Sequence, residues 1–77
     1  MVKSSTVFYF TMVVRVNGEK KDLQAGLSVA GLLEALGIRP GRVVVELNRD
    51  VVARAAHGAT VLKEGDTIEI VHFVGGG

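Results

Sequence analysis

The residues with the clearest chemical potential stand at the end of the sequence, where Gly75, Gly76 and Gly77 follow a β-rich segment. Glycine has no Cβ, so a tail of this kind is thin and can lie extended in a narrow channel. Fully extended, it would carry the Gly77 carboxylate about 10 Å beyond Val74. An activating enzyme could then join this carboxylate to the α-phosphate of ATP as an acyl-adenylate. An inert flexible terminus has the same composition, so the fold must decide between the two interpretations.

The rest of the chain offers no familiar enzyme site. It has no cysteine, which excludes a thiol nucleophile, a disulfide scaffold and an iron–sulfur cluster. His57 and His72 stand outside any metal-binding motif, and each is interpreted as a surface or strand residue. Glu64 and Asp66 belong to a turn, and Ser28 is better explained as a helix cap. We therefore expect no catalytic residues, no bound metal and no bound cofactor.

Composition and charge limit the kinds of partner that the chain can bind. The chain has 77 residues, enough for one small domain, and 48% of them are hydrophobic, which predicts a folded core. Nine Lys and Arg against eight Asp and Glu give a net charge of +1, too balanced for a typical nucleic-acid binder of this size. The apolar run Val7–Phe10 is too short and interrupted for a signal peptide or membrane span. We expect a cytoplasmic monomer with neither nucleic-acid nor membrane partners.

The first element is a β-hairpin. Two β-rich segments, Met12–Val16 and Glu19–Leu23, flank Asn17-Gly18. Asn-Gly is the strongest short hairpin signal, because both residues tolerate the positive φ of a type I′ turn. Alternation along the first strand then places Val14 and Val16 on one face.

A single helix follows, over residues 28–36. Its apolar residues Val29, Leu32, Leu33 and Leu36 recur at the spacing that makes one helix face. Ser28 is a typical N-cap, and Gly37 stands where a left-handed residue ends a helix. Pro40 prevents the helix from resuming, and Ile38 is expected to tuck back beneath it.

The remaining strands are predicted at Val43–Leu47, Val51–Arg54 and Thr67–His72, with an irregular loop over Ala55–Thr60 and a turn over Lys63–Asp66. The order β-β-α-β-β-β predicts an α+β domain, with the helix packed across one mixed sheet of four to five strands. The expected core consists of Val14, Val16, Leu23, Val29, Leu32, Leu33, Leu36, Val45, Leu47, Leu62, Ile68 and Ile70.

The last strand has two different faces. Ile68 and Ile70 share the inward parity, whereas Val71 and Phe73 fall on the opposite one. Single exposed apolar side chains are ordinary, but beside an active tail they could seat a partner protein. Val71 and Phe73 are therefore candidate docking residues.

From Met12 to Gly77 the chain resembles the ThiS family of sulfur carriers, members of the ubiquitin-like β-grasp superfamily. The most specific segment is Glu64–Gly77, with its Gly-Asp turn, Ile-Glu-Ile-Val strand and His-Phe-Val-Gly-Gly-Gly end. Three shorter segments also carry the resemblance: Val16–Glu19, Ser28–Leu33 and Val45–Val52.

The resemblance implies a substrate protein rather than an enzyme. An E1-like adenylyltransferase of the ThiF type would use ATP to adenylate Gly77, with Gly75 and Gly76 threading its channel. A sulfur donor such as a cysteine desulfurase relay would convert the adenylate to a thiocarboxylate. Thiazole synthase of the ThiG type would then take that sulfur for the thiazole ring of thiamin. Residues 12–74 would form the β-grasp domain and residues 75–77 the functional tail.

Three alternatives stay open on the sequence. A carrier for molybdopterin synthase shares the fold and tail, a protein modifier would join lysines through Gly77, and an inert interaction domain would not need Gly76 and Gly77. Residues 1–11 have no place in the family pattern. They form either an extra edge segment over Val7–Phe10 or an extension upstream of a native start at Met12. N-terminal sequencing of the endogenous protein tests the second idea, which a start at Met1 or Val2 would refute.

Overall fold

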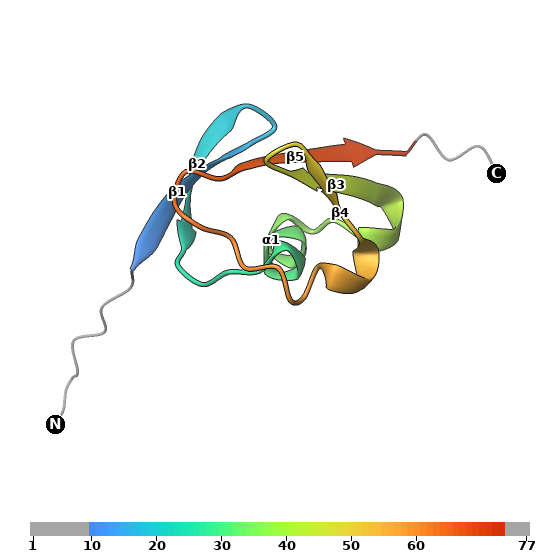
Figure 1. The fold of residues 1–77 in the computed structure, drawn as a ribbon, viewed down its shortest axis with the longest axis horizontal. Coiled ribbons are helices and arrows are strands. Elements are labelled where there is room, and N and C mark those ends of the chain that lie inside the picture. Colours follow the sequence, from blue (N-terminus) through green and yellow to red (C-terminus); the bar gives the residue numbers. More distant parts are fainter. Residues whose placement is uncertain (1–9, 74–77) are drawn as a thin grey trace, which may run out of the picture.

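A computed structural model describes residues 10–73, in which one α-helix crosses a five-stranded sheet (Figure 1). The helix α1 comprises Val29–Leu36, and short 3-10 turns, η1 and η2, occupy Pro40–Arg42 and Arg54–Ala56. The order of strands and helix is the predicted one. The strands are β1 (Thr11–Val16), β2 (Glu19–Gln24), β3 (Val43–Leu47), β4 (Asp50–Val52) and β5 (Thr67–His72).

The sheet is mixed, as predicted, with the strand order β2-β1-β5-β3-β4. Antiparallel pairing joins β1 to β2, β3 to β4 and β3 to β5. The pairing of β1 with β5 is parallel and short, joining Arg15 to Thr67 and Val16 to Ile68. The last strand is therefore the central one, although it is the last to be reached along the chain.

Local sequence signals account for the hairpin and the helix. Asn17 and Gly18 have φ of 50° and 83°, as a type I′ turn requires. The Ser28 hydroxyl accepts a hydrogen bond from the Gly31 N–H at 3.0 Å, so Ser28 is the N-cap and α1 begins at Val29. Gly37 adopts the left-handed conformation with φ 72°, and its N–H bonds back to the last turn of the helix. Both predicted caps are confirmed.

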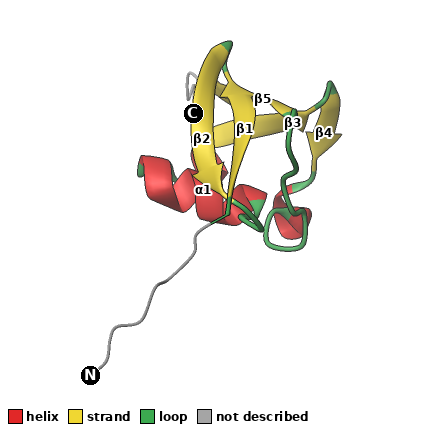
Figure 2. Cartoon of the chain, turned by 90° about the vertical axis from the view of Figure 1, so that its left-hand side faces the viewer, coloured by secondary structure: helices red, strands yellow, loops and turns green. Residues whose placement is uncertain are grey.

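The core lies between α1 and one face of the sheet (Figure 2). The prediction that Leu36 belongs to it was wrong, because this side chain is 40% exposed at the end of the helix. Ile38 instead packs against the core, after its N–H bonds to the Leu33 carbonyl. Leu23 and Leu47 are only partly buried. The buried core is Met12, Val14, Val16, Val29, Leu32, Leu33, Val43, Val45, Leu62, Ile68 and Ile70, in which Met12 and Val43 were not predicted.

The fourth strand is shorter than predicted and begins one residue earlier, at Asp50. Asn48 and Arg49 both have positive φ, 51° and 75°, so the turn needs only these two residues and pairing resumes at Asp50. The strand ends at Val52, and Arg54 opens η2 instead of extending the sheet. Among residues 10–73, none of the helices has the length and hydrophobicity of a membrane span.

Candidate functional site at the end of the last strand

The backbone of β5 is fixed along its whole length and one residue beyond. Its ladder with β3 runs from Leu47 opposite Ile68 to Val43 opposite His72. The Phe73 N–H then donates to the Arg42 carbonyl at 3.0 Å. The predicted tail residues Gly75, Gly76 and Gly77 lie outside the described residues, and their roles stay predictions. The structure positions Phe73, the last residue before the tail that it describes, and we call this point the root of the tail.

Two asparagines hold β5 on its two sides. The Asn17 side chain accepts from the Ile70 N–H at 2.7 Å and donates to the Ile70 carbonyl at 3.2 Å. On the other side, the Asn48 Oδ1 accepts from the Thr67 N–H at 2.9 Å. Sequence reasoning assigned both residues to turns and missed these contacts. Asn17 matters most here, because it bonds the strand beyond the point where β1 has ended.

A small apolar surface surrounds the root of the tail. Val71 and Phe73 are 53% and 56% exposed, as their strand parity predicted. Val71 lies opposite the half-buried Val44 of β3, and Val51 of β4 is exposed. Val44, Val51 and Phe73 line one hollow of about 310 Å³. We call Val44, Val51, Val71 and Phe73 the apolar patch.

The two histidines do not form a site with each other. His72 is an exposed residue of β5, as predicted. His57 is neither on a strand nor on the surface, which corrects the prediction: it is buried in the turn after η2. Its carbonyl accepts from the Ala30 N–H, which holds this turn against the start of α1, and its Nδ1 has no hydrogen-bond partner among the described residues. Residues 10–73 contain no cluster of three or more metal-ligating side chains.

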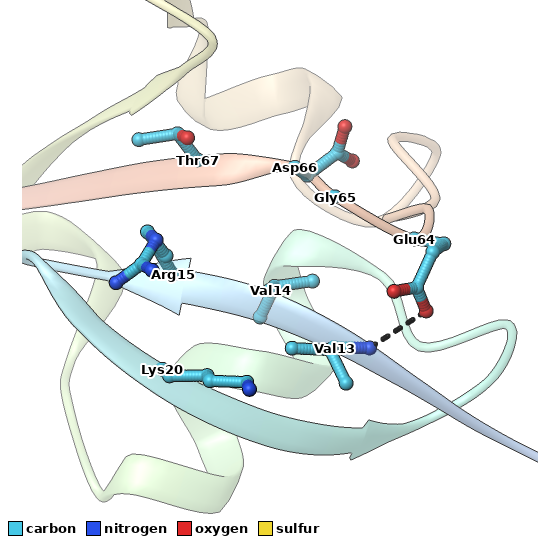
Figure 3. Close-up of a pocket in the computed structure, with 8 residues that line it drawn as sticks. All are labelled: Val13, Val14, Arg15, Lys20, Glu64, Gly65, Asp66 and Thr67. Atoms are coloured by element: carbon cyan, nitrogen blue, oxygen red, sulfur yellow. Dashed lines mark hydrogen bonds between the residues drawn. The ribbon is translucent and has the colours of Figure 1, made fainter.

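The carboxylates of the Lys63–Asp66 turn have structural partners. The Glu64 Oε1 accepts from the Val13 N–H at 2.8 Å, and the Asp66 Oδ2 accepts from the Lys63 N–H at 2.7 Å. Both carboxylates border a cavity of about 180 Å³ between β1 and this turn (Figure 3). The cavity lies at the start of β5, and the strand rises about 17 Å from there to the root of the tail. It is therefore remote from the predicted chemistry.

The fold is that of a ubiquitin-like β-grasp protein: one helix crosses a mixed five-stranded sheet, and three glycines follow the central strand in the sequence. The model of the ThiS family matches residues 7–77. The crystal structure of the thiamine biosynthesis protein (ThiS) from Geobacter metallireducens superposes with a TM-score of 0.76 at 40% identity, covering 86% of this chain and 100% of that one. The chain belongs to the ThiS family, as its sequence predicted. The match starts at residue 7, earlier than the predicted Met12.

Curated relatives of this chain include a protein of similar length and two much longer ones. The sulfur carrier protein ThiS of Bacillus subtilis is 33% identical over 69 residues, which cover 84% of this chain and 100% of that protein. A thiazole synthase of Magnetococcus marinus is 50% identical over 66 residues, 86% of this chain. A second one, from Paramagnetospirillum magneticum, is 36% identical over 66 residues. The chain spans only 20% of the length of these two thiazole synthases.

Proposed function

We propose that this chain carries sulfur for the thiazole ring of thiamin, as a thiocarboxylate on Gly77. The observation that carries the proposal is the place of the glycine tail. It follows a central strand that is hydrogen-bonded up to Phe73, with exposed apolar side chains around that point. A rigid root and a thin tail suit a protein that offers its last residue to the buried sites of other proteins.

The chemistry needs two steps at the Gly77 carboxylate. In the first step a carboxylate oxygen attacks the α-phosphate of ATP, and pyrophosphate leaves, giving an acyl-adenylate. In the second step a sulfide equivalent from the sulfur donor attacks the acyl carbon and AMP leaves. The product is a thiocarboxylate in which one sulfur has replaced one oxygen. An E1-like adenylyltransferase of the ThiF type holds the ATP, so the carrier needs no cofactor of its own.

The named relatives support thiazole synthase of the ThiG type as the acceptor. Segments similar to this chain occupy a fifth of two proteins that are named thiazole synthase. Four residues separate the anchored Phe73 from the end of the sequence. In extended form they reach about 14 Å, enough to enter an active site while the folded domain stays outside. The dependence on ATP favours a cytoplasmic location.

We assign the apolar patch the role of docking the adenylyltransferase. Phe73 is its largest side chain, and it is 56% exposed at the base of the tail. Full burial of an exposed ring contributes roughly 1.5–3 kcal/mol, so burying the exposed 56% of Phe73 against a partner contributes about 0.8–1.7 kcal/mol. Val44 and Val71 alternate along their strands with the buried Val43, Val45 and Ile70, so they lie on the face of the sheet opposite α1, where a partner can cover them without disturbing the core.

The proposed function is tested by intact-mass measurement. The protein is incubated with the adenylyltransferase of its own organism, ATP and sodium sulfide, beside a variant that lacks Gly77. We expect a mass gain equal to one sulfur replacing one oxygen, absent from the shortened variant. An unchanged mass, with an enzyme that modifies another carrier in the same buffer, would refute the carrier role. Lysine-linked adducts of high mass would instead support a protein modifier.

The docking role is tested separately by Phe73→Ala. We expect the KM for the carrier in the adenylation reaction to rise about tenfold, since most of the ring's contribution is lost. The thermal midpoint should stay nearly unchanged, because the ring is more exposed than buried. Val61→Ala is the matched control, since Val61 is 50% exposed at a site away from β5. An unaltered KM for Phe73→Ala, or an equal rise for the control, would contradict the assignment.

A further inference from the structure

A second hollow borders the root of the tail, and its lining is cationic. It has a volume of about 350 Å³ and is lined by Gly37, Ile38, Arg39, Arg42 and His72. Arg39 and Arg42 lie close together because the 3-10 turn η1 joins them, with the Arg42 N–H bonded to the Arg39 carbonyl at 3.0 Å. We call Arg39, Arg42 and His72 the basic rim.

The backbone that carries the basic rim is fixed beside the end of β5. The Arg42 carbonyl accepts the hydrogen bond from Phe73, and Val43, the next residue, lies opposite His72. Ile38 anchors the other side of the hollow through its bond to Leu33 and its packing on the core. The backbone of both arginines is therefore fixed by the same contacts that fix the end of β5.

Arg39 and Arg42 have no anionic partner within residues 10–73. The one ion pair in that part of the chain joins Lys21 to Glu19, on β2. Arg39 and Arg42 are exposed and lie near each other, so their charges repel rather than stabilise the fold. A cluster of this kind, at the point where the tail meets a partner, fits a surface of opposite charge.

We propose that the basic rim binds an acidic surface of the adenylyltransferase, at the entrance of the channel that receives the tail. This inference rests on the proposed function and names the chemistry of the partner. A nucleotide phosphate does not fit as the occupant, because an extended tail holds Gly77 about 14 Å beyond Phe73. The rim therefore meets protein and not ATP. The adenylyltransferase is the partner that each free carrier must find first, and surface charge acts mainly on the rate of such encounters.

The test compares two double variants that remove the same charge. Arg39→Gln with Arg42→Gln neutralises the rim, whereas Lys20→Gln with Lys63→Gln neutralises two exposed cations away from the root of the tail. The measurement is kcat/KM for adenylation of the carrier, by pyrophosphate release, at low and at physiological salt. We expect kcat/KM of the rim variant to fall about tenfold at low salt, and to depend much less on salt than that of the wild type. The control should stay within about twofold, and both variants should keep the thermal midpoint of the wild type.

Each outcome is decisive. Equal kcat/KM for the rim variant and the wild type would overturn the inference while leaving the carrier role intact, because the wild type would still be adenylated. Equal losses in both variants would show a general effect of net charge, which also overturns it. A loss confined to delivery of sulfur to thiazole synthase, with normal adenylation, would assign the rim to the other partner and refute the stated one. Failure of the wild type itself to be adenylated would refute the proposed function instead.

Discussion

The side chain of Asn17 offers the sharpest test of how the tail is held. The register of β1 with β5 comprises only Arg15 and Val16. Beyond that point, the side-chain amide of Asn17 makes two hydrogen bonds to the backbone of Ile70, where no strand pairs with β5 on this side. Asn17→Gly removes these two hydrogen bonds and little other contact. Glycine keeps the turn, because Gly-Gly also adopts the positive φ of a type I′ hairpin.

The expected loss of stability follows from these bonds. Each typical hydrogen bond contributes about 0.5–1.5 kcal/mol net, so the two together give about 1–3 kcal/mol. Glycine adds about 0.5–1 kcal/mol through the greater entropy of the unfolded chain. We expect a total loss of about 1.5–4 kcal/mol, and a shift of the thermal midpoint of about 4–8 °C for each kcal/mol. In a domain of 77 residues this is a large part of the whole stability.

Urea unfolding followed by far-ultraviolet circular dichroism measures the loss, since the chain has no tryptophan. Arg49→Gly is the matched control: Arg49 has φ 75° and is exposed, so glycine relieves its strained backbone while adding the same entropy. The free energy of unfolding of the control should lie within about 0.5 kcal/mol of the wild-type value or above it. Amide hydrogen exchange at Ile70 should accelerate in Asn17→Gly more than at Leu33 in α1. A stability for Asn17→Gly equal to that of the control would refute the reasoning.

Three further substitutions test the elements that carry the fold, each by urea unfolding. Ser28→Ala removes the N-cap bond to Gly31 and should cost about 0.5–2 kcal/mol; no loss would mean that water replaces the hydroxyl. Gly37→Ala should cost about 1–2 kcal/mol from the left-handed φ alone, because no atom lies within 4 Å of the added Cβ. A neutral result there would contradict the C-cap geometry. Leu32→Ala should cost about 2–5 kcal/mol and leave the domain largely unfolded, whereas a cost below that range would indicate a core that collapses around the gap.

Features set by neighbouring residues were predictable from the sequence. The Asn-Gly turn, the Ser28 cap and the Gly37 terminus depend on a few adjacent residues, and all three are confirmed. The exposure of Val71 and Phe73 followed from the two-residue period of a strand. The same period places Met12 on the face of Val14, so the burial of Met12 was also predictable from the sequence.

Errors arose where the residue types gave no sign of the outcome. Leu36 has helical spacing with Val29, but α1 ends there and Ile38 folds back to pack on the core. The start of β4 depended on Arg49, a residue type that gives no sign of a positive φ. The parallel pairing of β1 with β5 joins residues far apart in the sequence, so no local pattern could show that the last strand is central.

The central place of β5 explains why the root of the tail can be both rigid and open. On the β3 side, the ladder continues to His72 and the Phe73 bond extends it. On the other side, β1 has already ended, and only the Asn17 side chain reaches as far as Ile70. The strand therefore leaves the sheet held along one edge, with the apolar patch on its outer face and the basic rim beside its last residue. In the proposed function, a partner that receives the tail meets these two surfaces together. If Gly77 is adenylated as proposed, Asn17→Gly should therefore lower kcat/KM for that reaction through the position of Phe73, although the patch and the rim are intact.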